Sequence, residues 1–417
     1  MPEFQLIFVS ILALFVAWNL GANDVANSMG TSVGSKALTL RQALTLAGIL
    51  ELTGAIAFGQ AVSSALATEI VNPALFEDSP QTLLLGMVAV MISCGIWLQV
   101  ATLLGLPVAS SHAVVGAIAG FSWVAAGPGA VHWGELGQIA LGWLLTPIAS
   151  GAVAALFYAI ARRWILESDR PLIQLQEWIP WLSAILFAIF GVIVFPTLLT
   201  KAPFSEIALP SHSLALGLGG IAAVSFAAFN WRGLRKAAAT GAESGEGNIL
   251  EKSFGRFQVM SACFVAFAHG SNDVGNAIAP LAAIAYILQT QSVPHPPLSI
   301  PLWILVLGGM GLVAGLAVQG KSVIATVGEQ IIALQPSSGF CAELATATII
   351  LLASRSALPV STSHALVGAV VGIGLLRDRK SVRFSTLKSI ALAWAITLPV
   401  AVGLSAIGFI GLRGLFL

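Results

Sequence analysis

The heptapeptide Gly21-Ala-Asn-Asp-Val-Ala-Asn27 returns later in the chain as Gly270-Ser-Asn-Asp-Val-Gly-Asn276, with five of seven positions identical. A second segment that begins Pro107-Val-Ala-Ser-Ser-His112 returns as Pro359-Val-Ser-Thr-Ser-His364, and nine of its first fourteen residues are identical. The copies are 249 residues apart for the first motif (21 to 270) and 252 apart for the second (107 to 359). Two motifs that recur in the same order at nearly one spacing predict an internal duplication.

The composition around these motifs is that of a membrane protein. Of the 417 residues, 57% are hydrophobic and 9% are charged, whereas about 25% are charged in an ordinary soluble domain. Apolar runs over residues 4–20, 134–161 and 390–411 approach the roughly 20 residues that cross a bilayer as a helix. The first six residues carry an acid and no base, so they are interpreted as part of a first span and not as a signal peptide. The sequence predicts an all-α protein in the lipid bilayer, and the net charge of +1 gives no reason to expect nucleic acid as a partner.

Basic residues indicate how each copy is oriented, because Lys and Arg favour the cytoplasmic ends of spans. The chain meets Lys36 and Arg41 after the first heptapeptide, but residues 289–300 after the second have no basic residue. After the Ser-His segments the relation reverses, since residues 127–135 lack basic residues and residues 377–388 hold five. The two copies are therefore predicted to lie upside down relative to each other.

About twelve transmembrane helices follow from this pattern, with ten as the lower limit. We expect repeat 1 in residues 1–160, two connecting helices and a cytoplasmic linker in 161–256, and the inverted repeat 2 in 257–417. Because twelve is an even number of spans, both termini are expected on the same side of the membrane, which is the outer side by the basic-residue pattern. Pro, Ser and Gly in the two Ser-His segments predict broken or re-entrant helices there.

Asp24 and Asp273 are the first candidate site residues, because an ionisable group at membrane depth costs at least about 2.5 kcal/mol. Each is flanked by asparagines, which with the carboxylate supply oxygen ligands for an alkali cation. We expect Gly21 and Gly270 to let the helix unwind and offer backbone carbonyls as well. The alternative is a helix cap at the membrane surface. The asparagines are Asn23, Asn27, Asn272 and Asn276.

The Ser-His segments offer the complementary chemistry. Their hydroxyls lie at a predicted helix start, where unpaired backbone N–H groups and the positive end of the helix dipole bind anions. Plain N-caps, or hydroxyls packed between helices, are the alternatives. His112 and His364 either titrate or serve as fixed hydrogen-bonding groups. The hydroxyl residues are Ser110, Ser111, Ser361, Thr362 and Ser363.

Charge balance then predicts the mechanism. A site that contains two aspartates and an oxyanion carries a total charge of about −3 to −4. Neither motif pair contains Arg or Lys to offset that charge. Burying that charge costs several kcal/mol per ion unless cations bind with it. The expectation is a symporter in which two or three sodium ions accompany the anion, with no organic cofactor. Glu51 and Glu343 are further acids in apolar segments, and each is either part of the pathway or a protonated or hydrogen-bonded structural group.

With the paired motifs, Pro280-Leu-Ala-Ala and Gly320-Lys-Ser-Val-Ile, nearly the whole chain resembles the inorganic phosphate transporter family of sodium- or proton-coupled phosphate permeases. The resemblance implies an inverted-repeat fold that holds inorganic phosphate and sodium at its centre. It assigns both aspartates and their asparagines to the ion cluster. It makes Ser110, Ser111, Thr362 and Ser363 the anion donors, and gives Glu51 and Glu343 the place of acids implicated in transport.

Ala109 departs from the family pattern, because it replaces the first hydroxyl residue of that segment. Sulfate permeases occur in the same family, so sulfate is the rival substrate and proton coupling the rival mechanism. The family also implies a homodimer, and the composition suggests a prokaryotic plasma membrane or an organelle envelope derived from one. An anion channel and an intramembrane hydrolase remain alternatives of other classes. Adjacent Ser and His residues rarely form a nucleophile and its base, so an enzyme is not expected.

Overall fold

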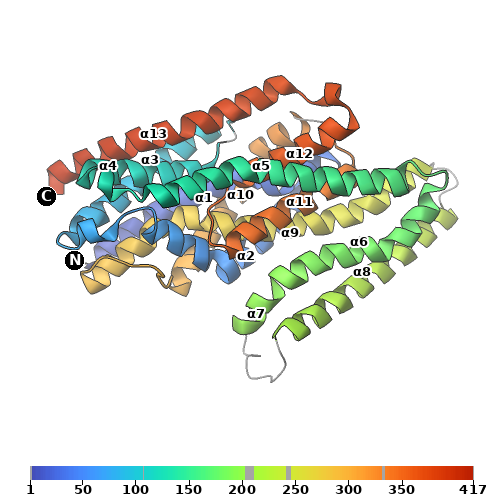
Figure 1. Cartoon of the computed structure of the whole chain (residues 1–417), viewed down its shortest axis with the longest axis horizontal. Coiled ribbons are helices and arrows are strands. Elements are labelled where there is room, and N and C mark those ends of the chain that lie inside the picture. The colour runs from blue at the N-terminus through green and yellow to red at the C-terminus, as the bar shows by residue number, and fades with distance from the viewer. Residues whose placement is uncertain (1, 107, 202–210, 241–245, 331–333, 417) are drawn as a thin grey trace.

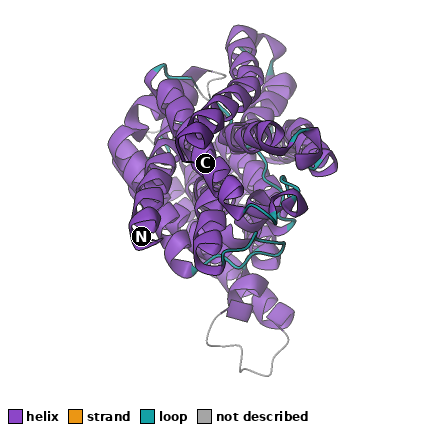
Figure 2. Cartoon of the chain, turned by 90° about the vertical axis from the view of Figure 1, so that its left-hand side faces the viewer, coloured by secondary structure: helices purple, strands orange, loops and turns teal. Residues whose placement is uncertain are grey.

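The computed structural model describes residues 2–106, 108–201, 211–240, 246–330 and 334–416. Within these ranges the chain consists of helices joined by short loops, with no strand (Figure 2). The helices are α1 (Pro2–Gly34), α2 (Leu40–Thr68), α3 (Pro80–Leu103), α4 (Ser110–Ala126), α5 (Trp133–Ala161), α6 (Pro171–Ile193), α7 (Phe195–Lys201), α8 (Ser211–Thr240), α9 (Glu246–Thr290), α10 (Leu302–Gln330), α11 (Pro336–Arg355), α12 (Thr362–Arg377) and α13 (Phe384–Phe416).

Most of these helices have the length and composition of membrane spans. In the described ranges, nine helices have an apolar stretch long enough to cross a bilayer, and α4 and α12 are shorter apolar helices. Large apolar side chains such as Phe4, Ile7 and Ile407 are exposed on the outside of the bundle. Helices suit this environment because their backbone groups bond to one another and need no water. The chain is a multi-pass membrane protein.

The order of the helices agrees with the predicted twelve. Five helices, α1 to α5, precede residue 162; α6 and α8, with the short α7, form a pair at one side of the bundle; and α9 to α13 follow (Figure 1). Both termini lie at the same end of the molecule in that view. The linker expected at the end of the stretch 161–256 is largely helical in the described residues, because α8 continues to Thr240 and α9 begins at Glu246. Its Ala, Lys and Glu residues are strong helix formers.

Glycines bring α1 against α10 and α2 against α9. A Cβ added to Gly21 would collide with the backbone carbonyl of Leu312, and one added to Gly270 would collide with the carbonyl of Glu51. Small residues allow such approach between membrane helices, where van der Waals packing holds the contact. Each heptapeptide is thus fixed in the bundle interior by a partner helix.

The helices that begin at the Ser-His segments pack in the same way. Gly120 of α4 lies against the backbone of Val402 in α13, and Gly372 of α12 lies against the backbone of Gly151 in α5. Helix α4 therefore packs on a helix from the C-terminal part of the chain, and α12 on one from the N-terminal part. This exchange brings both helix starts to the centre of the bundle.

Candidate functional site

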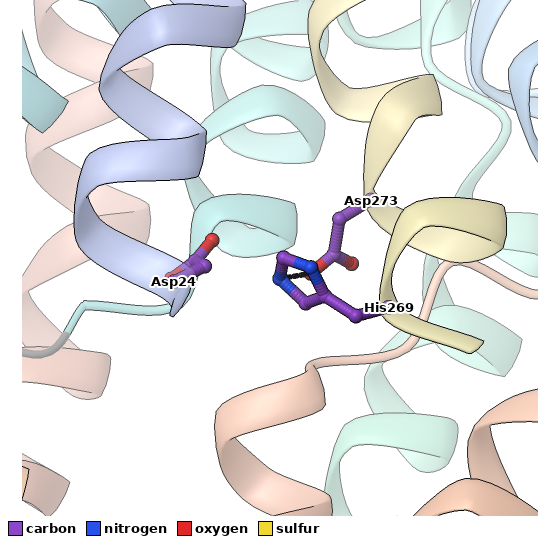
Figure 3. A group of neighbouring side chains, drawn as sticks. All are labelled: Asp24, His269 and Asp273. Atoms are coloured by element: carbon purple, nitrogen blue, oxygen red, sulfur yellow. Dashed lines mark ion pairs between the residues drawn. The ribbon is translucent and has the colours of Figure 1, made fainter. Parts of the chain in front are cut away.

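Asp24 of α1 and Asp273 of α9 face each other in the middle of the bundle, with His269 of α9 beside them (Figure 3). All three side chains are buried. One ligand atom from each lies within 4.8 Å of the others. The two copies of the heptapeptide, 249 residues apart, therefore meet at one site.

The expected unwinding of the helices at Gly21 and Gly270 is wrong. Helix α1 runs without a break from Pro2 to Gly34, and α9 from Glu246 to Thr290. The glycines serve close packing, since the missing Cβ admits a neighbouring backbone. The backbone carbonyls there stay within the helices, so ligands come from side chains.

His269 was not predicted as a site residue. Its Nε2 lies 2.9 Å from Oδ2 of Asp273, and its Nδ1 lies 3.1 Å from Oε1 of Glu51, with all three side chains essentially inaccessible. A bare nitrogen lone pair would repel a carboxylate, so a proton belongs on each nitrogen or on the facing carboxyl group. The sequence held a signal for this ring, because His269 precedes Asp273 by four residues and so shares its helix face.

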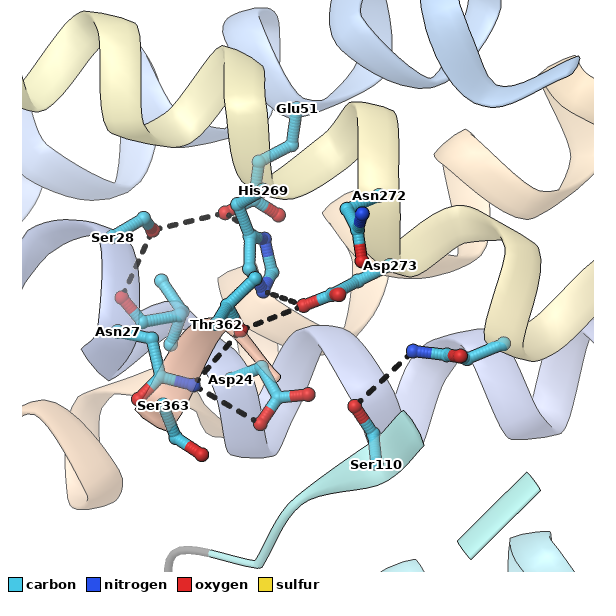
Figure 4. Close-up of polar contacts among 12 residues, drawn as sticks. Asp24, Asn27, Ser28, Glu51, Ser110, His269, Asn272, Asp273, Thr362 and Ser363 are labelled. Atoms are coloured by element: carbon cyan, nitrogen blue, oxygen red, sulfur yellow. Dashed lines mark hydrogen bonds and ion pairs between the residues drawn. The ribbon is translucent and has the colours of Figure 1, made fainter. Parts of the chain in front are cut away.

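The starts of α4 and α12 complete the site from the other side (Figure 4). Thr362 donates a hydrogen bond to Oδ2 of Asp273 at 2.9 Å, and Asn27 lies 3.5 Å from the same hydroxyl. In the equivalent position of the other half, Asn276 donates to Ser110 at 3.4 Å. Each heptapeptide thus contacts the Ser-His helix of the opposite half, and the predicted anion and cation residues meet.

Ser111 and Ser363 differ in how their hydroxyls are used. The Oγ of Ser111 is buried and has no hydrogen-bond partner among the described residues. Ser363 shares a hydrogen bond of 2.9 Å with Ser361, which also caps the start of α12. The α4 start therefore presents a hydroxyl donor that the protein itself does not use.

Asn23 and Asn272 fix the loops that lead into these helices. The amide of Asn23 donates to Thr102 and to the carbonyl of Leu106, both at 3.2 Å. The amide of Asn272 donates to Ser354 and Leu358, both at 3.1 Å. The side-chain carbonyl oxygens of both asparagines are buried and have no hydrogen-bond partner among the described residues.

Unpartnered oxygens gather in this region. Among the described residues, five buried acceptor atoms of the predicted cluster have no hydrogen-bond donor, an arrangement that costs free energy unless a donor or a cation binds. They are Asp24 Oδ2, Asp273 Oδ1 and the Oδ1 atoms of Asn23, Asn272 and Asn276. Carboxylate and amide oxygens are the ligands that hard cations take.

Glu343 lies apart from this cluster in a polar site of its own. Its Oε1 accepts hydrogen bonds from Thr31 and Ser32, both at 2.6 Å, and from Gln258 at 3.1 Å. Its Oε2 accepts one from Ser261 at 2.7 Å. The side chain of Glu343 is inaccessible, and four neutral donors surround its carboxyl group.

His112 and His364 do not contact the buried acids through the hydrogen bonds that the structure records. The Nδ1 of His112 lies 3.3 Å from the carbonyl oxygen of Trp394, and that of His364 lies 3.0 Å from the carbonyl oxygen of Trp143. Both rings thus have a defined hydrogen-bond partner on another helix. They are held next to the two anion-donor segments.

A buried polar site lies where α1, α4, α9 and α12 meet inside a multi-pass membrane protein, an arrangement typical of a membrane transporter. A model of the phosphate transporter family matches residues 20–405. The chain belongs to the phosphate transporter family.

Known relatives align with this chain over nearly its full length. The chain is 38% identical to the putative phosphate permease of Pyrococcus abyssi, covering 97% of each. It is also 38% identical to the chloroplastic inorganic phosphate transporter 2-1 of Arabidopsis thaliana, covering 95% of this chain and 70% of that one. A solved structure described as the sodium-dependent phosphate transporter superposes with a TM-score of 0.88, at 34% identity and 99% coverage of both chains. Sequence and fold therefore point to the same family.

Proposed function

We propose that this protein imports inorganic phosphate across a plasma membrane by symport with sodium ions, which bind beside the phosphate in the central site. The anion donors are the hydroxyls and helix starts of α4 and α12, supplied by Ser110, Ser111, Thr362 and Ser363. The cation ligands are the oxygens of Asp24, Asp273 and their flanking asparagines. In this proposal the sodium ions bridge the phosphate to Asp24 and Asp273, so both aspartates belong to the substrate site as well.

Charge balance is the observation that carries this proposal. Asp24, Asp273 and Glu51 lie around one imidazole, and among the described residues no lysine or arginine side chain is buried. A protonated His269 offsets one negative charge at most. Adding an oxyanion leaves several uncompensated charges in a site that excludes water, which several kcal/mol per ion would disfavour. Sodium ions at the unpartnered oxygens remove that cost.

The paired contacts support transport by alternating access between two inverted repeats, 1–160 and 257–417, connected by 161–256. Gly21 with Leu312 repeats as Gly270 with Glu51, and Asn27 with Thr362 repeats as Asn276 with Ser110. In transporters of this kind the substrate binds between the repeats, and each repeat in turn opens a path to one side. The contacts between the two halves at this site support a position of that kind.

Glu343 is proposed as a second position on the ion pathway. A carboxylate with three hydroxyl groups and an amide at 2.6 to 3.1 Å has the oxygen composition of a sodium site, because a hydroxyl can rotate its proton away and offer its oxygen. Glu51 acts differently in this proposal, since it holds His269 next to Asp273.

The structural neighbour's description as sodium-dependent supports sodium as the coupling ion. For location, we propose the plasma membrane with both termini outside. The basic residues 377–388 then lie on the cytoplasmic side, as the positive-inside rule requires. A homodimer in the membrane is proposed on family resemblance.

Uptake of labelled phosphate into liposomes that contain the purified protein tests the proposal. An inward sodium gradient, a proton gradient or neither is applied, with sulfate as competitor. Phosphate accumulation that requires sodium and resists sulfate is the expected result. Accumulation driven by a proton gradient alone would show that protons, and not sodium ions, are the coupling ions. Uptake of sulfate without uptake of phosphate would show that sulfate is the substrate. Flux without any co-ion gradient would favour a channel.

A further inference from the structure

Four aromatic rings form a column at the starts of α4 and α12. The rings follow one another in the order Trp143, His112, His364, Trp394, with centroid separations of 3.8, 4.9 and 3.7 Å. We call these four residues the ring column. Both histidines directly follow an anion donor in the sequence, since Ser111 precedes His112 and Ser363 precedes His364. The ring column therefore lies next to both halves of the proposed anion site.

The helices of the ring column belong to two tightly packed units. Helices α4 and α13 form one unit, and α5 and α12 form the other, each joined where a glycine lies against the partner's backbone. The helices of one unit make few backbone contacts with those of the other. The ring column is thus a side-chain contact that joins the two units.

The hydrogen bonds of the ring-column residues lie within each unit, and their ring contacts lie between the two units. His112 donates through Nδ1 to the Trp394 carbonyl, and both belong to the α4/α13 unit. His364 donates to the Trp143 carbonyl, and both belong to the α5/α12 unit. The indole of Trp143 donates to the carbonyl of Pro359, just before α12. Directional bonds therefore fix each helix start within its own unit.

All three ring contacts, in contrast, cross from one unit to the other. Along the column the rings belong to α5, α4, α12 and α13 in turn, so that each ring contacts only rings of the other unit. Aromatic contacts tolerate tilted and edge geometries at similar energy, so they hold a separation while they permit rotation. Hydrogen bonds across the same boundary would fix one orientation.

We propose that the ring column is the joint between the two units, and that His112 and His364 are positioning residues that set the separation of the two anion-donor helix starts. This inference rests on the proposed function, because it concerns the same anion site. Neither histidine needs to touch the anion. Losing a ring would let the helix starts drift apart, so phosphate affinity would fall even though every anion donor is present.

Two substitutions at each histidine separate the ring from its hydrogen bond. Asn in place of His112 or His364 keeps a short donor for the tryptophan carbonyl and removes the ring, whereas Phe keeps the ring and removes the donor. Each histidine makes two ring contacts, so the Asn variants should raise the KM for phosphate about tenfold, as expected for losing two aromatic contacts. The Phe variants should stay close to wild type. His132→Asn and His132→Phe are the controls, because His132 makes the same kind of bond, to the Glu69 carbonyl at 2.9 Å, outside the column.

A distance measurement tests the joint independently of transport. Spin labels at Val124 and Leu375, which are 40% and 45% exposed, report on α4 and α12 after the three cysteines are replaced. The Asn variants should broaden the distance distribution, while the Phe and His132 variants should not. Trp394→Leu, at a half-buried position, removes the ring contact with His364. It should broaden the distance distribution as His364→Asn does, and it tests the joint if an Asn variant does not fold.

The outcomes distinguish the joint from the transport function. Wild-type protein that shows no sodium-driven uptake would overturn the proposed function, and the spin-label distances would still decide the joint. Equal KM values and equal distance distributions for the Asn and His132 variants would overturn the joint. Phe variants as impaired as the Asn variants would overturn it too, because the hydrogen bond, and not the ring, would then be responsible.

Discussion

The carboxylate of Glu51 lies 3.1 Å from Nδ1 of His269, and both side chains are inaccessible to solvent. The equivalent positions of the other half, by the contacts of Gly21 and Gly270, are Leu312 and Leu20. Both leucines are buried in the main apolar core. A titratable pair in one half thus occupies the place of an apolar pair in the other, and it is one of the differences between the two halves of the site.

Removing one member of this pair should destabilise the protein more than removing both. His269→Leu leaves the Glu51 carboxylate buried without its partner, a change that costs about 3–5 kcal/mol in comparable pairs. The double variant His269→Leu with Glu51→Leu restores the apolar pair of the other half. Thermal unfolding of the wild type, both single variants and the double variant measures this double-mutant cycle. If the loss of stability in the double variant equals the sum of the two single losses, the two groups do not interact.

Asp24→Asn should abolish sodium-driven phosphate uptake while the protein stays folded. The change removes a buried charge and a cation ligand but keeps the side-chain volume, so the unfolding temperature should not fall. Uptake into liposomes and thermal unfolding are measured on the same preparation. Asp78→Asn, an exposed acid in a loop, is the control. Normal gradient-driven uptake by the Asp24 variant would exclude this carboxylate as a coupling ligand.

Ser111→Ala should weaken phosphate binding without changing stability. Its hydroxyl has no partner among the described residues, so the folded protein loses no bond of its own. A hydrogen bond to a charged group contributes about 1.5–3 kcal/mol, which corresponds to roughly a ten- to hundredfold increase in KM. Ser122→Ala on the same helix, whose hydroxyl bonds to the Ile118 carbonyl at 2.6 Å, should leave KM unchanged. Equal KM values for both variants would move the anion site elsewhere.

Glu343→Gln should raise the sodium concentration needed for half-maximal uptake. The amide nitrogen of glutamine cannot accept the hydrogen bonds that Thr31, Ser32 or Ser261 now donate, and the negative charge is lost. Initial rates at fixed phosphate and varied sodium measure this effect. A sodium response identical to that of wild type would leave Glu343 a structural group.

Gly270→Ala should prevent close approach of α9 and α2, because the new Cβ would collide with the backbone of Glu51. Backbone atoms cannot rotate aside, so the two helices must separate. The yield of monodisperse protein and its unfolding temperature should both fall. Gly142→Ala, where nothing lies near the added Cβ, should instead be neutral or stabilising, since alanine favours the helix by up to about 1 kcal/mol.

The sequence determined the membrane location, the all-helical class and the candidate residues of the site. Apolar runs of span length can only form helices in a bilayer, and the repeated motifs identified Asp24, Asp273 and the Ser-His segments before any contact was known. The two glycines misled the prediction, because glycine serves a backbone turn and a close helix contact equally well. Which of the two applies depends on the neighbouring helix.

Only the tertiary structure decided which elements meet. Asn27 and Thr362 lie 335 residues apart and contact each other at 3.5 Å, a pairing that depends on how the two halves exchange helices. His269 became a site residue only when α2 brought Glu51 to it, because its spacing from Asp273 places both on one helix face but does not show what that face meets. The ring column is of the same kind, since its four rings come from four helices. Local patterns specify which residues can bind ions, but long-range packing determines which of them share a site.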